Sequence, residues 1–290
     1  MTPFSINIKG QLLTCGKPLV MGILNVTPDS FYSASRCWQE ETLEQNAARL
    51  IAEGADIIDI GGYSSRPGAS DITPDEELRR IATGIKAIKK IAPEIPVSID
   101  TFRADVARAA ILDHGADIIN DIAAGDLDNR MFDTVAELNV PYIAMHMRGT
   151  AAQMQSLTDY TESGGVTADI IAKLSEKVDR LEQKGVADII IDPGFGFAKT
   201  IAQNFEVLRD LRVIDNAIRR PILVGVSRKS MIYRTLDITP DESLNGTTVI
   251  NTLALERGAA ILRVHDVAEA RQAVNLWIET NKKYELIRRR

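Results

Sequence analysis

Glu53-Gly54-Ala55-Asp56-Ile57-Ile58 joins the end of an expected helix directly to an expected strand, and similar stretches recur along the chain. They lie at residues 114–119, 184–190 and, less closely, 257–262. Each contains a glycine, which suits the left-handed residue that closes a helix because it has no Cβ to clash. The uninterrupted apolar residues that follow indicate strands buried on both faces, as in a parallel sheet.

Eight apolar runs of this kind are spread over the whole sequence. They cover residues 19–26, 56–61, 97–100, 118–122, 142–147, 189–192, 222–227 and 261–265. The segments between them have helical length and period, as in residues 75–92, where Thr73 and Pro74 suit an N-cap and a first helical position. Strand and helix alternating eight times predict an α/β protein with a (β/α)₈ TIM barrel. A doubly wound open sheet is the alternative.

The front of the chain and its length bear on domain organisation. Residues 4–13 place Lys9-Gly10 between two alternating stretches, which predicts a short N-terminal β-hairpin rather than a ninth unit. A length of 290 residues on its own suggests about two domains. Single α/β barrels reach this size, however, and no composition break or linker divides the sequence. We therefore expect residues 1–290 to form one barrel domain.

Composition and charge exclude several classes of protein. A net charge of −6 and a pI near 5.3 argue against a nucleic-acid-binding protein, which usually needs a basic face. No run approaches the roughly 20 apolar residues of a spanning helix, so no membrane association is expected. Cys15 and Cys37 are too few for a disulfide framework, and no secretory signal is visible. We therefore expect a cytoplasmic protein.

Chemistry in α/β barrels lies on the loops after the carboxyl ends of the strands, and every predicted strand brings a polar residue there. One group consists of short hydrogen-bond acceptors, Asp100, Asn120 and Asp192. A buried carboxylate needs donors, because desolvation otherwise costs several kcal/mol. A flat heterocycle with ring N–H and amino groups would satisfy Asp192 through both oxygens. The alternative is that these residues cap helices or bridge loops.

The second group is cationic and consists of Arg66, Lys229, Arg263 and His265, with Asn25 nearby. Cations that converge on one rim indicate an anion, most simply a phosphate, although a solvated charged face is the alternative. The segment Gly194-Phe195-Gly196 is not a dinucleotide fingerprint and suits a close approach of backbone to a ligand. Any metal would be a hard cation such as Mg²⁺, held by substrate phosphates and an oxygen such as that of Asn25.

Eight segments together resemble the dihydropteroate synthase family of folate-pathway enzymes. They are MGILNVTPDSF (21–31), DIIDIGGYSSRPGA (56–69), SIDT (98–101), INDI (119–122), MHM (145–147), DPGFGF (192–197), SRKS (227–230) and RVHD (263–266). The resemblance implies a (β/α)₈ barrel, usually a homodimer and a target of sulfonamides. The implied reaction joins 6-hydroxymethyl-7,8-dihydropterin pyrophosphate to para-aminobenzoate, giving 7,8-dihydropteroate and pyrophosphate with the help of Mg²⁺.

The resemblance also implies which residues bind which part of the substrates. The pterin site falls on Asp100, Asn120, Asp192 and Lys229, with Met147 lining the pocket, and Gly196 is a further substrate-binding residue. The pyrophosphate site falls on Asn25, Arg66, Arg263 and His265, with Asn25 also the Mg²⁺ ligand. The aminobenzoate pocket falls on Phe31, Ser65, Pro67, Phe197, Lys229 and Ser230. Asp100, Asp192, Lys229, Arg263 and His265 would act directly on the reaction.

Three departures from the family pattern stand out. Tyr63 occupies a position where many members carry Glu, and Ser65 one where many carry Thr. The missing methyl at Ser65 would loosen the aminobenzoate pocket slightly. Ala occurs in the segment 149–154 where Pro is common. Two other functions compete with the synthase: a pterin-binding methyltransferase that passes a methyl group to a corrinoid, and a non-catalytic pterin-binding paralogue.

Overall fold

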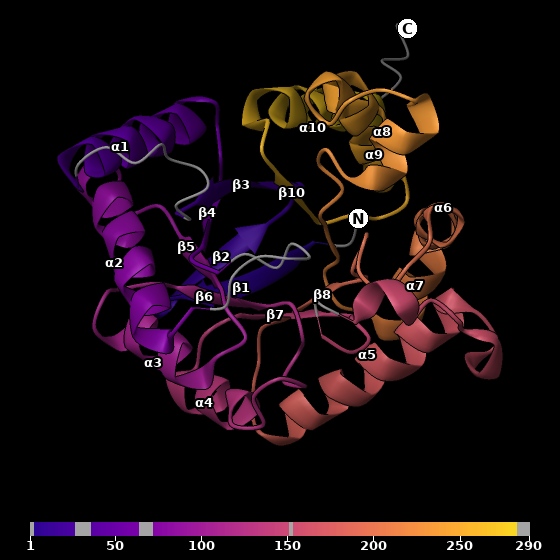
Figure 1. Cartoon of the computed structure of the whole chain (residues 1–290), viewed down its shortest axis with the longest axis horizontal. Coiled ribbons are helices and arrows are strands. Elements are labelled where there is room, and N and C mark those ends of the chain that lie inside the picture. The colour runs from indigo at the N-terminus through magenta and orange to yellow at the C-terminus, as the bar shows by residue number, and fades with distance from the viewer. Residues whose placement is uncertain (1–2, 27–35, 64–71, 151–152, 283–290) are drawn as a thin grey trace, which may run out of the picture.

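Eight parallel strands form one curved sheet enclosed by helices (Figure 1). The computed structural model describes residues 3–26, 36–63, 72–150 and 153–282. In it the strands are β3 (Leu19–Asn25), β4 (Ile57–Gly61), β5 (Val97–Asp100), β6 (Ile118–Asp121), β7 (Tyr142–Met145), β8 (Ile189–Asp192), β9 (Leu223–Val224) and β10 (Ile261–Val264). Their order is β8-β7-β6-β5-β4-β3-β10-β9. A parallel bridge between Ile191 and Ile222 joins the two ends of this order. The predicted (β/α)₈ barrel is confirmed, and the open sheet is wrong.

The helices alternate with these strands as the apolar period predicts. They are α1 (Arg36–Ala52), α2 (Pro74–Ile91), α3 (Ala104–Leu112), α4 (Met131–Leu138), α5 (Val166–Gln183), α6 (Ile201–Arg209), α7 (Leu211–Ile218), α8 (Ser230–Leu236), α9 (Leu244–Glu256) and α10 (Val267–Asn281). The Thr73 hydroxyl accepts a hydrogen bond from the Glu76 N–H at 3.3 Å, so the predicted N-cap of α2 is confirmed. The glycines of the repeat have φ between 79° and 103°, which explains why glycine closes these helices (Gly54, Gly115, Gly185 and Gly258).

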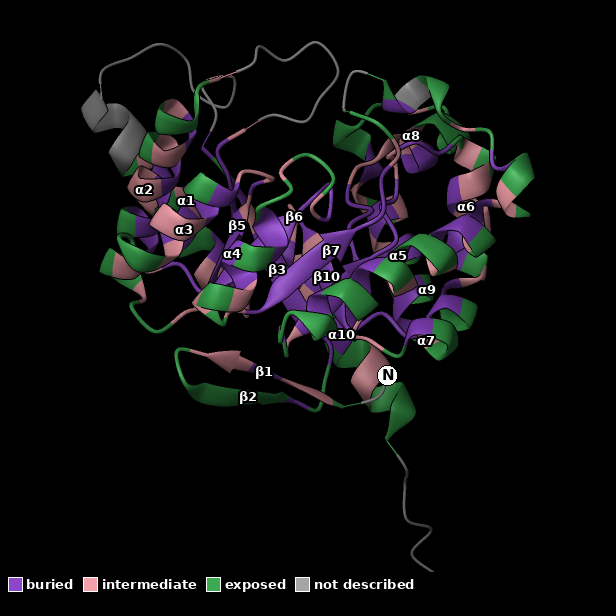
Figure 2. Ribbon diagram, turned by 90° about the horizontal axis from the view of Figure 1, so that it is seen from below, coloured by how far each residue is buried: buried purple, intermediate pink, exposed green. Residues whose placement is uncertain are grey.

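A β-hairpin lies below the amino-terminal end of the barrel (Figure 2). Its strands are β1 (Phe4–Ile8) and β2 (Gln11–Cys15), joined by Lys9-Gly10 with both φ angles positive. The hairpin extends to Cys15, beyond the predicted limit at residue 13, because Phe4 pairs with Cys15. Ile6 is buried against the apolar floor of the barrel, so the hairpin covers that end.

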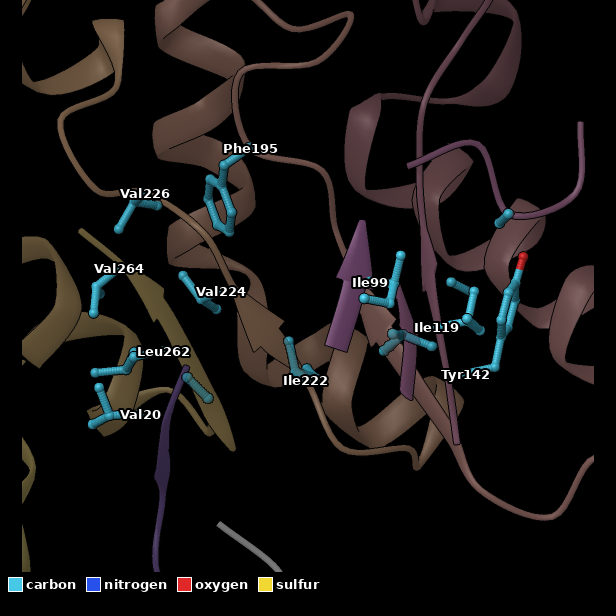
Figure 3. Close-up of a cluster of buried hydrophobic side chains, with 14 of the residues drawn as sticks. Val20, Ile99, Ile119, Tyr142, Phe195, Ile222, Val224, Val226, Leu262 and Val264 are labelled. Carbon is cyan, nitrogen blue, oxygen red and sulfur yellow. The ribbon is translucent and has the colours of Figure 1, made fainter. Parts of the chain in front are cut away.

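Alternating side chains on each strand supply two different environments. One set packs between the sheet and the helices, as Val20, Ile119, Val224 and Leu262 do (Figure 3). The other set forms the floor inside the barrel, with Ile57, Ile118, Ile190 and Ile261 among its members. Because side chains two residues apart share a face, the next inward position on those four strands is polar (Asp59, Asn120, Asp192 and Arg263). The sequence pattern therefore places an apolar floor beneath a polar upper layer.

Candidate functional site

The carboxyl ends of four neighbouring strands form one row of polar or small residues. Strand register pairs Asn25 with Gly61, Gly61 with Asp100, and Asp100 with Asn120. Asn25 is exposed, whereas Asn120 is buried. The prediction that Asn25, Asp100 and Asn120 share one rim is therefore confirmed by the register of the sheet.

Arg263 lies at the centre of this end of the barrel and is held by two carboxylates. Its Nε donates to Asp59 Oδ2 at 2.7 Å, and its Nη2 donates to Asp100 Oδ2 at 2.8 Å. The Asn120 amide also donates to Asp59, at 3.2 Å. Arg263 thus lies among the acceptors predicted for a heterocycle, and not only beside the cations predicted for a phosphate.

The surroundings of Asp100 shift the pKa of its carboxyl group. Burial raises the pKa of Asp100 to about 7, although the positive charge of Arg263 opposes the shift. The neighbouring charges of Asp59 and Glu77 act in the same direction as burial. Arg263 and a bound ring that carries positive charge would both favour the carboxylate form of Asp100.

A second carboxylate and a second cation are Asp192, at the end of β8, and Lys229, directly before α8. Asp192 is buried, and its Oδ1 accepts a hydrogen bond from the Gly194 N–H at 2.7 Å. Burial raises the pKa of Asp192, and the charge of Lys229 opposes this. Burial lowers the pKa of Lys229 to about 8, against the attraction of Asp192. Each group thus supports the charged form of the other in a site with little water.

The backbone of the 194–197 segment fits closely around Lys229. The ammonium donates to Phe195 O at 2.5 Å and lies 4.9 Å from the centre of the Phe197 ring. A Cβ on Gly196, whose φ is +81°, would lie 3.2 Å from Lys229 Cδ. Gly196, Phe197 and Lys229 therefore occur together as predicted, and glycine is needed at 196 both for its backbone angle and for the approach of the lysine.

An apolar wall adjoins these polar groups. Met147 is only 8% exposed and belongs to a cluster with Ile122, Ala123, Met145, Met154 and Ala198, against which Phe102 and Phe197 pack. A flat ring hydrogen-bonded at its edge needs such apolar surfaces on its faces. The predicted position of Met147 beside the acceptor group fits this requirement.

Two further predicted residues lie near the end of β10 and the start of α8. The His265 Nδ1 is 3.1 Å from Ser227 Oγ, and its backbone N–H donates to the same hydroxyl at 3.3 Å. Ser230 is the first residue of α8, directly after Lys229. Arg228 Nη2 donates a hydrogen bond to Asp266 Oδ1 at 2.8 Å. Arg228 therefore has a structural role and does not belong to the cationic group.

Four predicted site residues, Phe31, Ser65, Arg66 and Pro67, lie outside the described residues. Tyr63 is described, and its ring contacts that of Phe102 edge to face at 5.2 Å. Arg103 covers both rings. The departure at Tyr63 therefore places an aromatic side chain against the loop after β5.

Asn25 is the one residue that the sequence suggests as a metal ligand. Within the described ranges no group of three or more His, Cys, Asp or Glu side chains could hold a metal ion. An exposed amide oxygen at a strand end suits a cation that is bound mainly through substrate phosphates and water, as Mg²⁺ usually is. The donors present thus fit Mg²⁺ in that mode and do not fit a metal held only by protein.

Sequence reasoning assigned no role to several buried polar residues that support this site. Asp59 is fully buried and holds both Arg263 and Asn120. His146, Asp169, Lys199 and Asn204 are also buried and lie beneath the loops after β7 and β8. The sequence does contain a signal for Asp59, because it is a charged residue inside an apolar strand. A buried carboxylate of this kind needs a hydrogen-bond partner.

The site can be compared with known proteins. A model of the pterin binding enzyme family matches residues 21–265. The chain belongs to this family.

Individual relatives match over most of the chain. Dihydropteroate synthase of Escherichia coli is 38% identical over 284 residues, which is 96% of this chain and 98% of that protein. The structure of Xanthomonas albilineans dihydropteroate synthase with 4-aminobenzoic acid has a TM-score of 0.88 at 37% identity and covers 97% and 100% of the two chains. The same enzyme in complex with 7,8-dihydropteroate gives a TM-score of 0.84 at 34% identity, with the same coverage.

Other pterin-binding relatives are longer. The folic acid synthesis protein fol1 of Schizosaccharomyces pombe is 39% identical over 267 residues. These cover 89% of this chain and 36% of that protein. The chain therefore spans about a third of the length of this relative.

Proposed function

We propose that the protein is a dihydropteroate synthase. It would join 6-hydroxymethyl-7,8-dihydropterin pyrophosphate to para-aminobenzoate and release pyrophosphate. The observation that carries the proposal is that two carboxylates and two cations share one rim. Asp100 accepts a hydrogen bond from Arg263, and the buried Asp192 lies in the field of Lys229. This arrangement suits a ring that is rich in N–H donors and carries an anionic leaving group. The relatives named dihydropteroate synthase support it.

The chemistry would be mainly electrostatic. The displacement would be dissociative: the bond between the pterin CH₂ carbon and the pyrophosphate oxygen breaks first. The aminobenzoate nitrogen then bonds to the carbocation-like carbon and loses a proton. Asp100 and Asp192 stabilise positive charge on the pterin, while Arg263 and His265 stabilise the departing pyrophosphate. Phe31, Ser65, Pro67, Phe197 and Ser230 would line the aminobenzoate pocket, and Arg66 would bind phosphate.

An assay of pyrophosphate release with and without para-aminobenzoate tests the proposal. A synthase forms dihydropteroate only when aminobenzoate is present, and it releases one pyrophosphate for each dihydropteroate formed. A methyltransferase that uses a corrinoid would not release pyrophosphate under these conditions, and a non-catalytic paralogue would bind the pterin without turnover. The synthase is contradicted if aminobenzoate changes neither pyrophosphate release nor product.

We also propose that Mg²⁺ assists the reaction, with Asn25 as a ligand. When bound, the ion would neutralise charge on the pyrophosphate. Removal of divalent cations with EDTA is expected to lower pyrophosphate release to the background rate, and added MgCl₂ should restore it. Asn25→Ala should raise the Mg²⁺ concentration needed for half-maximal turnover by about tenfold. Undiminished turnover in EDTA would remove the metal from the mechanism.

A cytoplasmic homodimer is a further part of the proposal, and the surface between α9 and α10 is the candidate interface. A groove of about 700 Å³ there is lined by Thr248, Leu276 and Trp277, among others. Leu276 is 68% exposed, and Val249 is 50% exposed on the same pair of helices. Exposed apolar groups gathered on one surface are typical of protein interfaces. No helix in the described ranges is long and apolar enough to span a membrane.

The dimer can be tested by light scattering after size exclusion. The wild-type protein is expected at twice the chain mass of 31.8 kDa. Leu276→Glu should move the mass towards one chain, because it buries a charge in an apolar contact. Leu112→Glu, at a leucine 64% exposed on α3, is the matched control and should leave the mass unchanged. A monomeric wild-type protein would contradict the proposal.

A further inference from the structure

Lys199 is a buried ammonium directly below the loop that carries Phe195, Gly196 and Phe197. Lys199 as a whole is only 5% exposed. Its Nζ donates to Gly194 O at 2.9 Å and to Phe197 O at 3.1 Å, and it lies 3.0 Å from His146 Nδ1. A lysine ammonium has three N–H donors and no acceptor, so these three partners match its full capacity.

The partner of His146 fixes which ring nitrogen carries the proton. The Nε2 atom is 2.9 Å from Asp169 Oδ2, and an ionised carboxylate can only accept. The Nε2 must therefore be the donor, which leaves Nδ1 of the neutral ring as an acceptor for Lys199. Burial lowers the pKa of His146 to about 4, which agrees with a neutral ring.

The same cluster extends to the loop after β7. Arg148 donates to Asp169 Oδ1 at 2.6 Å and covers the Tyr160 ring at 3.9 Å. The Tyr160 hydroxyl in turn donates to Ala198 O at 2.9 Å. Residues 146–148 and 194–199 are therefore tied to each other by side chains that lie beneath the proposed substrate site.

The carbonyl groups that Lys199 binds determine the shape of the segment above it. Gly194 and Phe197 stand at its two ends, and the Phe197 N–H also donates to Gly194 O at 3.1 Å. Between them, Phe195 O accepts the hydrogen bond from Lys229. A Cβ on Gly194 would collide with the His146 carbonyl oxygen, so the segment packs directly on the end of β7.

We propose that Lys199 is a positioning residue, which acts through the 194–197 backbone to hold Phe197 and Lys229 in place for aminobenzoate. The inference rests on the proposed function for its substrate. Lys199 itself is covered by the segment and acts through its three hydrogen bonds. Burial lowers the pKa of Lys199 to about 7, and the charges of Lys229 and Arg148 act in the same direction, while the Asp192 and Asp169 carboxylates oppose the shift.

Lys199→Met tests the proposal because it removes the ammonium and keeps an unbranched stem of similar length. Loss of the three hydrogen bonds of the ammonium group is expected to raise KM for aminobenzoate at least about tenfold. The kcat should change much less, since Asp100, Asp192 and Arg263 remain. Lys86→Met, at an exposed lysine on α2, is the matched control and should behave as wild type.

A pair of variants at His146 separates positioning from packing. Asn can place an oxygen near the position of Nδ1 and still accept from Lys199, whereas Gln can place its amide near Nε2 and donate only to Asp169. Both lose the ring next to Tyr160. We expect His146→Asn to keep a KM close to wild type and His146→Gln to resemble Lys199→Met. Equal KM values for the two variants would overturn the proposal.

Hydrogen exchange provides a readout that does not depend on the reaction. Amides in residues 194–199 should exchange faster in Lys199→Met and His146→Gln than in the wild type or His146→Asn. Unchanged exchange and unchanged KM in Lys199→Met would overturn the positioning role. If the wild-type protein shows no aminobenzoate-dependent pyrophosphate release, the proposed function fails, and exchange alone decides whether Lys199 holds the segment.

Discussion

Asp192→Asn is expected to weaken binding of the dihydropterin by at least about 100-fold, which corresponds to about 2.7 kcal/mol. One oxygen of Asp192 already accepts the Gly194 N–H at 2.7 Å. Asparagine would keep its oxygen on that N–H and turn its NH₂ group towards the ligand, where a donor would face a donor. Hydrogen bonds to a charged group contribute about 1.5–3 kcal/mol each, so the loss of an acceptor for ring N–H groups is large.

The stability of the Asp192→Asn protein should move in the opposite direction to its affinity. Burial raises the pKa of Asp192, so the folded protein binds a proton there more readily than the unfolded chain does. Ionised Asp192 therefore lowers the free energy of unfolding at pH values above its folded pKa, and the neutral amide removes this cost. Lys199 and Lys229 can lose their protons near pH 8 once Asp192 is neutral, so neither is left as an uncompensated charge. We therefore expect urea unfolding at about pH 8 to show equal or higher stability.

Calorimetric titration with the pterin substrate or a pterin analogue measures the affinity. Asp179→Asn, at an exposed aspartate on α5, is the matched control for the same chemical change. Binding as tight as that of the wild type would show that the pterin site lies elsewhere. A parallel loss of stability and affinity would instead indicate general damage to the barrel.

Much of the fold follows from local sequence signals. The glycine that ends a helix and the apolar strand behind it both depend on a few neighbouring residues, so the eight units and the hairpin could be predicted. Strand length could not. Residues 222–227 are continuously apolar or small, yet β9 contains only Leu223–Val224. Val226 is buried in the outer core, which shows that apolar residues report burial rather than ladder hydrogen bonds.

The residues of the site also fall into those that the sequence predicts and those that it does not. Asp100, Asn120, Asp192 and Lys229 could be predicted because they end strands, and a barrel brings all strand ends to one rim. Asp59 and Lys199 could not, because their roles depend on partners distant in sequence. Arg263, for example, lies 204 positions from Asp59. Period-two alternation shows that Asp59 faces inward, but only the structure shows which cation meets it.

Arg263→Gln is expected to have the largest combined effect on stability and activity. Arg263 is the cation held by both Asp59 and Asp100. Removal of one partner from a buried ion pair costs about 3–5 kcal/mol, because the remaining charge is left uncompensated. Removal of a group that stabilises charge in the transition state lowers turnover by about 10²–10³-fold. Urea unfolding and pyrophosphate release would measure the two effects.

A second substitution separates these two roles of Arg263. In Arg263→Gln/Asp59→Asn the fully buried Asp59 charge has gone and only the partly exposed Asp100 keeps its carboxylate, so most of the lost stability should return. Turnover should stay low because the leaving group still lacks its cation. The single variant should also recover stability as the pH falls from about 8 to about 5.5. Without the opposing charge of Arg263, burial would raise the folded pKa of Asp100 further, so its penalty applies above that pKa and disappears as the carboxyl group protonates. Arg209→Gln, at an exposed arginine on α6, is the control. If the double variant regained turnover as well as stability, Arg263 would serve only to neutralise Asp59.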